Sequence, residues 1–161
     1  MAHAQKTFRE DSRLHSPQSE NWSKWKTAMV PLYDRTNTVN RDQNQVGFIW
    51  KYIQHYGNLP EQCGIYEWRA IGQNQPNRVV YVGSTYSRCE RLQSRILGYC
   101  SHGNHKADLI NDALTKGYTL EVRYKQTWDE PEATKLENDL LDMYDYAWNV
   151  RRNGNIRAVL W

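Results

Sequence analysis

Two short segments, Gly64–Tyr66 and Tyr81–Gly83, consist of apolar and β-prone residues and flank a polar stretch of the chain. That stretch, residues 71–77, contains glycine, proline and asparagine, a composition typical of a hairpin loop. We therefore predict antiparallel strands over residues 64–71 and 78–83. Such a hairpin places the two tyrosines on neighbouring strands, and its glycines leave room for a bulky group to approach the backbone.

The chain beyond the hairpin shows helical and strand-like spacing of apolar residues in turn. Leu92 and Ile96, for example, fall on one face of a helix. The predicted elements are a helix over 88–99, a helix over 106–116, a strand over 119–126 and a helix over 132–144. Together they predict the α/β class, more narrowly α+β, with a small three-stranded antiparallel sheet flanked by helices.

The first 60 residues are predicted to form an extension of this core. Residues 1–20 are polar and are expected to be disordered. Apolar residues at helical spacing predict helices over 20–33 and 46–56. We expect the helical extension, residues 21–60, to pack on a core domain of residues 61–161.

The tryptophans of this extension allow a second interpretation. Lys24, Lys26 and Arg35 are interleaved with tryptophans, and a surface of that kind could stack on DNA or clamp it. Seven tryptophans in 161 residues more often serve cores and interfaces. Packing is therefore the favoured interpretation.

Charge is distributed unevenly along the chain. The formal net charge is +3 and the sequence pI is about 8.7, so the protein is modestly basic. Acidic residues gather between residues 129 and 145, which predicts a basic side that faces phosphates and an acidic back. The basic residues gather at Arg88, Arg91, Arg95, Lys106, Arg123 and Lys125, and again at Arg151, Arg152 and Arg157.

Hydropathy and cysteine content argue against several classes of protein. The mean hydropathy is −0.90 and there is no long apolar run, which argues against membrane spans. The N-terminus lacks the apolar core of a secretory signal. Three cysteines, an odd number, argue against a disulfide framework, and thiols in a reducing compartment fit better.

A cluster of cysteine and histidine raises the question of zinc. Its members are Cys89, Cys100, His102 and His105. Structural zinc sites usually show paired ligands at short spacing on both sides, and here only one side has them. We therefore do not predict a zinc site.

The hairpin and the segments after it resemble the GIY-YIG nuclease superfamily. The signature of that superfamily is a GIY strand, a YIG or YVG strand, an arginine on the next helix, a glutamate on a later helix and then an asparagine. This chain carries GIY at 64–66 and YVG at 81–83, and the later positions come in the same order. The resemblance covers about residues 61 to 155.

The resemblance implies a catalytic site and a divalent metal ion. The implied catalytic residues are Tyr66, Tyr81, Arg91, Glu137, Asn149 and His105. Glu137 is the implied ligand of Mg²⁺, with Mn²⁺ as a substitute. Many members have a histidine where this chain has Arg95. Contacts to DNA phosphates are expected from Gly83, Arg95, Lys106, Arg151 and Arg152.

The chemistry of phosphodiester cleavage gives each group a task. A water must be deprotonated in line with the leaving oxygen, and charge on the transition state must be stabilised. Tyr66 is the expected base or positioner of that water, with its pKa lowered by Arg91, by Arg95 or by the metal. Arg91 offers a fork of donors to the phosphate. Tyr81 would hydrogen-bond the phosphate or the water, and Asn149 would orient Glu137 or line the site.

Each of these residues also has an ordinary structural interpretation. Arg91 and Arg95 could be solvated charges on a helix. Glu137 could belong to an acidic helix face, although it adjoins the apolar stripe of that helix, and Asn149 could be a turn residue. Taken together and in order, the positions favour the catalytic interpretation.

A narrower resemblance links the chain to the plant EFFECTOR OF TRANSCRIPTION proteins, through residues 63–68, 98–110 and 144–149. Those proteins combine a GIY-YIG-like domain with nuclear, DNA-linked roles. The expectation is a nuclear, metal-dependent DNA endonuclease that serves DNA repair or a chromatin-linked task. One alternative is a DNA-binding or transcription-regulatory module of the same fold with little or no cleavage, and another is a zinc-stabilised interaction domain.

Overall fold

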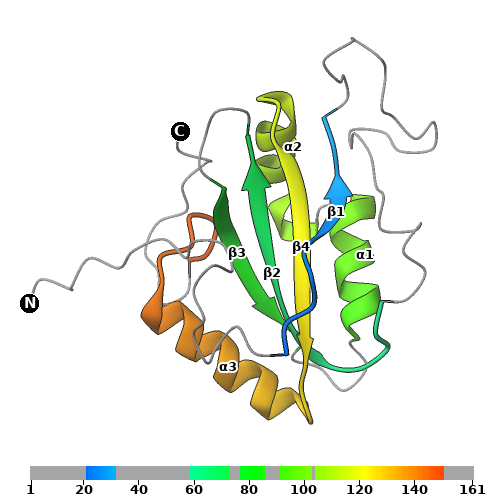
Figure 1. Cartoon of the computed structure of the whole chain (residues 1–161), viewed down its shortest axis with the longest axis vertical. Helices are drawn as coiled ribbons and strands as arrows, with labels where there is room; N and C mark the ends of the chain where they lie inside the picture. The colour runs from blue at the N-terminus through cyan, green and yellow to red at the C-terminus, as the bar shows by residue number, and fades with distance from the viewer. Residues whose placement is uncertain (1–20, 32–58, 73–76, 86–90, 103, 151–161) are drawn as a thin grey trace, which may run out of the picture.

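The computed structural model describes residues 21–31, 59–72, 77–85, 91–102 and 104–150. Four strands and three α-helices make up this part of the chain (Figure 1). The strands are β1 (Lys26–Met29), β2 (Gly64–Ile71), β3 (Arg78–Ser84) and β4 (Thr119–Gln126). The helices are α1 (Leu92–His102), α2 (Ala107–Thr115) and α3 (Glu130–Met143), and a short 3₁₀ helix, η3 (Asn104–Lys106), precedes α2.

The four strands form one antiparallel sheet in the order β1-β4-β2-β3. Strands β2 and β4 pair along their whole length, from Gly64 opposite Gln126 to Ile71 opposite Thr119. The pairing of β2 with β3 shifts register after Trp68, so that Trp68 faces Tyr81 while Arg69 faces Val79. Because Trp68 and Tyr81 are directly paired, and Tyr66 lies two residues before Trp68, the three aromatic side chains share one face of the sheet, and the bulge adds Val80 to the same core.

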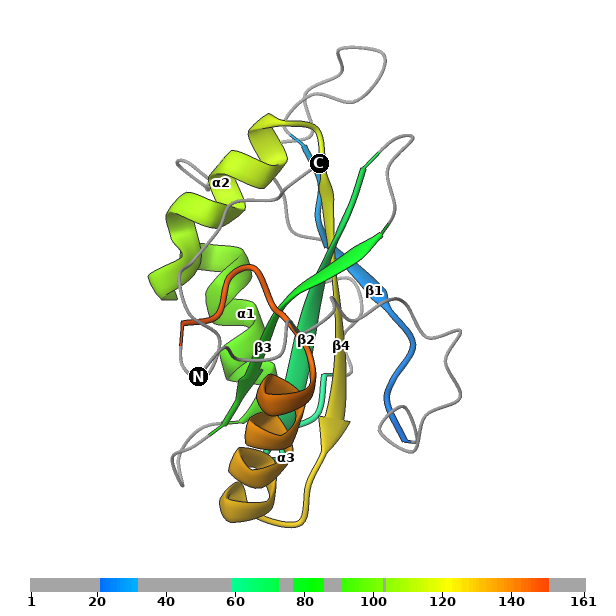
Figure 2. The same ribbon diagram turned by 90° about the vertical axis from the view of Figure 1, so that its left-hand side faces the viewer.

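Helices cover the two faces of the sheet unequally. Helices α1 and α2 lie together on one face (Figure 2), where they enclose the larger core with Trp68, Val80 and Leu120. The opposite face packs on α3 through Ile65, Val79 and Val82, and these contact Ala133, Leu140 and Leu141 of the helix. Successive β2 residues thus point into different cores, as strand geometry requires.

The α+β class, the antiparallel sheet and the flanking helices are confirmed. Strands β2 and β4 have the predicted limits, and β3 is longer by one residue. Helix α1 begins at Leu92 rather than at residue 88 and continues to His102. Helix α3 begins two residues earlier than predicted because Asp129 caps it, accepting a hydrogen bond from the Glu132 N–H, and a proline occupies its first turn.

The prediction of three strands and of a helix over 20–33 is wrong. Residues 26–29 form strand β1, which pairs with the edge of β4 and buries Ala28 and Met29. Tryptophans at helical spacing suggested a helix, but an open edge of β4 offers backbone partners that a strand satisfies. The predicted helix over 46–56 and the N-terminal residues 1–20 lie outside the described residues, and the domain limits stay a prediction.

Trp22 and Trp25 pack on the sheet, which confirms the packing interpretation for these two residues. The guanidinium of Arg123 lies 4.6 Å from the Trp22 ring and 4.7 Å from the Trp25 ring, and that of Arg69 lies 4.5 Å from Trp25. Arg123 also donates two hydrogen bonds to Glu67 Oε1, at 2.9 and 2.6 Å. The expectation that Arg123 belongs to a phosphate-facing surface is therefore wrong, because this side chain is buried.

No helix within the described parts of the chain combines the length and the apolar character needed to cross a bilayer.

The buried Glu67–Arg123 ion pair yields a prediction about stability. Replacing Arg123 by Met should lower the free energy of unfolding by about 3–5 kcal/mol, because the Glu67 carboxylate would stay buried without its cation. Lys116→Met is the matched control, since its ion pair with Asp112 is exposed and should be worth less than about 1 kcal/mol. Urea unfolding of both variants measures the difference. Equal losses would contradict this account.

Candidate functional site

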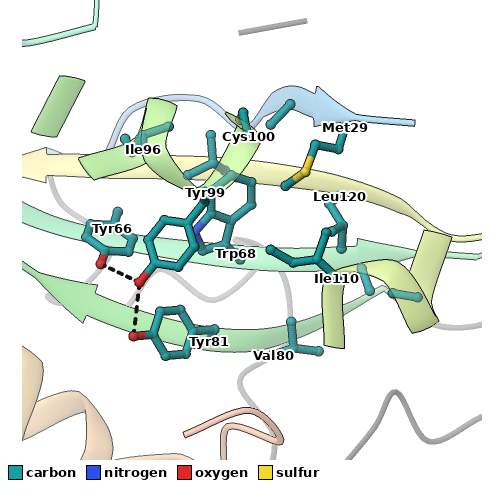
Figure 3. Close-up of a cluster of buried hydrophobic side chains, with 14 of the residues drawn as sticks. Met29, Tyr66, Trp68, Val80, Tyr81, Ile96, Tyr99, Cys100, Ile110 and Leu120 are labelled. Carbon is teal, nitrogen blue, oxygen red and sulfur yellow. Dashed lines mark hydrogen bonds between the residues drawn. The ribbon is translucent and has the colours of Figure 1, made fainter. Parts of the chain in front are cut away.

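Three tyrosines meet on the face of the sheet that α1 covers (Figure 3). Tyr66 comes from β2, Tyr81 from β3 and Tyr99 from α1. The hydroxyls of Tyr66 and Tyr99 are 3.0 Å apart, and the Tyr99 hydroxyl donates to that of Tyr81 at 3.2 Å. The three rings pack edge-to-face or tilted, with centroids 5.7 to 6.3 Å apart. We call these three residues the tyrosine cluster.

A cation and an imidazole stand at the two ends of the tyrosine cluster. Arg95 Nε donates to the Tyr66 hydroxyl at 3.2 Å, and the Arg95 guanidinium lies 5.6 Å from the Tyr99 ring. At the other end, the Tyr81 hydroxyl lies 3.2 Å from Nε2 of His105, whose side chain is exposed. The fold thus brings four of the predicted site residues, Tyr66, Tyr81, Arg95 and His105, into one hydrogen-bonded group.

The Tyr66 hydroxyl lies against Gly83, in the space that a side chain at position 83 would occupy. A Cβ atom at Gly83 would lie 2.4 Å from Tyr66 Oη and 2.6 Å from Cζ, closer than any real side chain could approach. The glycine of the YVG segment is therefore required by the tyrosine of the GIY segment. Gly83 also precedes Ser84, whose side chain points to the opposite face of the strand.

The environment raises the pKa of each tyrosine in the cluster. Burial raises the pKa of Tyr66 well above its ordinary value of 10.0, and the neighbouring Tyr99 and Tyr81 add to this effect. The pKa values of Tyr81 and Tyr99 are also raised, mainly by burial. Arg95 lowers the pKa of Tyr66, as expected, but its effect is outweighed. The expectation of a lowered Tyr66 pKa is therefore wrong for the protein alone.

Glu137 of α3 lies at the end of β3, beside Ser84, whose side chain points away from the tyrosine cluster. The Ser84 hydroxyl donates to Glu137 Oε2, and the Glu137 side chain is half-buried. Among the described residues, no group of three or more histidine, cysteine, aspartate or glutamate side chains is placed to hold a metal ion. A single carboxylate beside a hydroxyl nevertheless fits Mg²⁺, which uses few protein ligands and keeps several waters or phosphate oxygens.

Asn149 fastens the segment after α3 to the open edge of β3. Its Oδ1 accepts from the Val82 N–H at 3.0 Å and its Nδ2 donates to the Val82 carbonyl at 2.9 Å. The Trp148 N–H donates to the Val80 carbonyl at 2.8 Å. Asn149 is buried and acts here as the partner of an edge strand. A role in orienting Glu137 stays a prediction.

Lys106 is placed differently from the expectation. It is only 5% exposed, its Nζ donates to the Trp148 carbonyl at 2.5 Å, and it lies 5.1 Å from the Tyr81 ring. Burial lowers its pKa. An ammonium that is covered in this way supports Tyr81 and the Trp148 backbone, and its contact with phosphate stays a prediction.

Arg91 stands apart from the tyrosine cluster, at the residue before α1. It is exposed and pairs with Glu61 at 3.6 Å, and both side chains are more than half exposed. Such a surface pair is weak, so a phosphate could replace the carboxylate at little cost. Arg151, Arg152 and Cys89 lie outside the described residues, and Cys100 is fully buried in the larger core.

Sequence reasoning missed Tyr99 and Ser84. Tyr99 follows Leu92 and Ile96 on the buried face of α1, and a buried tyrosine hydroxyl usually needs a partner. That spacing was the available signal. Ser84 gave none, because its contact with Glu137 joins residues 53 positions apart in the chain.

Comparison with known proteins gives one family and two relatives. The sequence profile of the GIY-YIG domain-containing proteins matches residues 22–159. The chain is 32% identical to Protein EFFECTOR OF TRANSCRIPTION 3 of Arabidopsis thaliana over 148 residues, which is 84% of this chain and 52% of the relative. It is 27% identical to Protein EFFECTOR OF TRANSCRIPTION 2 of the same plant over 129 residues, 63% of this chain and 27% of the relative. The chain thus spans about half, or less, of these relatives, and no solved structure matches it.

The contact between Gly83 and Tyr66 predicts a coupled pair. Gly83→Ala should lower the free energy of unfolding by about 1–3 kcal/mol, because the added methyl overlaps the Tyr66 hydroxyl. Tyr66→Phe removes that oxygen, so the double variant should lose less stability than the sum of the two single losses. Denaturant unfolding of the four proteins measures the coupling. Strict additivity would show that the two residues do not touch.

Proposed function

This chain belongs to the GIY-YIG domain-containing proteins, and from that premise we propose that it is a metal-dependent DNA endonuclease. The reaction is hydrolysis of a phosphodiester bond, by nicking or by cleavage linked to DNA structure. The supporting observation is the arrangement around two adjacent residues of β3. Gly83 seats Tyr66 of the tyrosine cluster on one side, and Ser84 holds Glu137 on the other.

Glu137 is the residue that would hold the divalent ion, with Ser84 fixing the orientation of the carboxylate. When bound there, Mg²⁺ or Mn²⁺ would stabilise negative charge on the phosphate and on the leaving oxygen. Two other groups supply positive charge from the protein itself. Arg91 is exposed and only weakly paired, so its planar guanidinium is available to a phosphate. Arg95 donates a hydrogen bond to the Tyr66 hydroxyl.

Tyr66 and Tyr81 position the attacking water. Because both hydroxyls are buried and hydrogen-bonded, their orientation is fixed before substrate arrives. Tyr66 is fully buried, so the proposal requires a small opening over its hydroxyl when DNA binds. Asn149 and Lys106 hold the 148–149 backbone on β3, which keeps Tyr81 in place from the edge of the sheet.

A second candidate function comes from the names of the two relatives. Both are called effectors of transcription, a name that does not describe cleavage. The same fold could serve as a DNA-binding or transcription-regulatory module with little or no cutting. For either function we propose a nuclear location and a part in DNA repair or in a chromatin-linked process.

Plasmid nicking distinguishes the two functions. The wild-type protein with Mg²⁺ or Mn²⁺ should convert supercoiled plasmid to nicked circles, and Glu137→Gln should lose at least about 10²-fold in rate because the metal ligand is gone. Asp139→Asn is the matched control, since it removes an exposed carboxylate from the same helix. It should cut like the wild type.

DNA binding is measured in the same samples, by titration with labelled duplex, fork and flap substrates. Binding by both proteins without cutting of any substrate would contradict the nuclease and favour the regulatory module. Equal cutting by Glu137→Gln and Asp139→Asn would remove Glu137 from the site.

A further inference from the structure

We propose that Tyr99 completes a proton relay that runs from Tyr66 through Tyr99 and Tyr81 to His105, with the exposed imidazole as the final acceptor. The inference rests on the proposed function, because the proton in question comes from the water that attacks the phosphodiester. Tyr99 would act through its neighbours without touching DNA, which makes it a positioning and relay residue.

The geometry of the tyrosine cluster supplies an unbroken path. Successive oxygen or nitrogen atoms are separated by 3.0 Å from Tyr66 to Tyr99, 3.2 Å from Tyr99 to Tyr81 and 3.2 Å from Tyr81 to His105 Nε2. Figure 3 shows the first two links, with the Tyr99 hydroxyl between the other two. Tyr99 thus bridges the hydroxyls of Tyr66 on β2 and Tyr81 on β3, which form no direct hydrogen bond with each other among the described residues.

The direction of the hydrogen bonds suits transfer toward His105. Arg95 Nε donates to the Tyr66 oxygen. Either hydroxyl could donate between Tyr66 and Tyr99, but because the Tyr99 proton is directed to Tyr81, Tyr66 is the donor to Tyr99. Tyr99 donates to Tyr81. The Tyr81 proton then points to His105 Nε2, which accepts it when the other ring nitrogen carries the imidazole proton.

The step balances without an additional reactant. The water oxygen forms a bond to phosphorus while the bond from phosphorus to the leaving oxygen breaks. The water proton passes to the Tyr66 oxygen as the Tyr66 proton passes to Tyr99, the Tyr99 proton to Tyr81, and the Tyr81 proton to His105. The products are the cleaved phosphodiester and an imidazolium, which returns its proton to solvent.

A relay explains how buried phenols could serve as a base. Burial raises the pKa of all three tyrosines, so a standing phenolate would be rare at neutral pH. A concerted shift of protons leaves every tyrosine neutral before and after the step. Tyr66 is fully buried in the free protein, and bound DNA would cover the opening over its hydroxyl, so the proton needs a way out other than direct contact with bulk solvent.

The charges that face His105 keep its imidazole ready to accept. Partial burial of the ring, the adjacent Lys106 on η3 and Arg95 on α1 lower its pKa from 6.5, so the neutral form dominates at pH 7. The other groups that face it are the neutral Tyr81 on β3 and Tyr99 on α1, and Glu137 on α3 acts on those two phenols. Cutting should therefore decline in acid, as His105 becomes protonated at a pH lower than that of an ordinary histidine.

The test is Tyr99→Phe, which keeps the ring and removes the bridging oxygen. Metal-dependent cutting should fall by about 10²- to 10⁴-fold with unchanged DNA affinity, and the low-pH decline assigned to His105 should disappear. A multi-proton solvent isotope effect in the wild type should become a single-proton effect. Tyr124→Phe, a half-buried tyrosine of β4 outside the cluster, is the matched control and should cut like the wild type.

A nitrogen-15 NMR titration of His105 provides a readout that does not depend on cutting. The relay requires Nε2 to be the unprotonated, hydrogen-bonded nitrogen in the wild type. Protonation of Nε2 in the neutral ring would overturn the relay, as would a Tyr99→Phe variant that cuts at the wild-type rate with the same pH profile. Absence of cutting by the wild type on all substrates would instead overturn the nuclease, and with it the relay's catalytic role.

Discussion

The structure depends on a requirement that three buried phenols impose: each hydroxyl must find a partner inside the core. A buried hydroxyl without a partner is costly, and these three satisfy one another from β2, β3 and α1. Their shared hydrogen bonds connect α1 to β2 through Tyr66 and to β3 through Tyr81. The same bonds place Arg95 and His105 at the two ends of the group. Packing and the proposed chemistry thus use the same atoms.

The edge of β3 carries the second constraint. An open strand edge beside a proposed DNA-cleaving site would be free to move, and the segment after α3 closes it with backbone bonds and the Asn149 amide. Lys106 and Tyr146 tie this segment to the rest of the fold, Lys106 through the Trp148 carbonyl and Tyr146 through a 2.7 Å bond to Glu67. Lys106 and Asn149 look like surface groups in the sequence, but both are buried and hold this segment in place.

The sequence predicts the hairpin, β4 and the order of the helices because these depend on local spacing and turn residues. The hairpin pattern also places Tyr66, Tyr81 and Gly83 on neighbouring strands, whereas the contact of Glu137 with the end of β3 joins residues 53 positions apart and does not follow from the local pattern. Strand β1 could not be predicted, because its identity comes from the open edge of β4 rather than from its own residues. The burial of Lys106 and Arg123 was missed for a related reason. Both have buried partners that lie 42 and 56 residues away in the chain.

The central claim is that Tyr66 acts directly on the water that cleaves DNA. The most direct test compares Tyr66→Phe with the wild type, with cutting rate and DNA affinity measured on the same preparations in the presence of Mg²⁺. This account predicts a loss of at least about 10²-fold in cutting with unchanged affinity, because the phenol touches the reacting water and contributes no net charge to DNA binding. Cutting at the wild-type rate by Tyr66→Phe would contradict it.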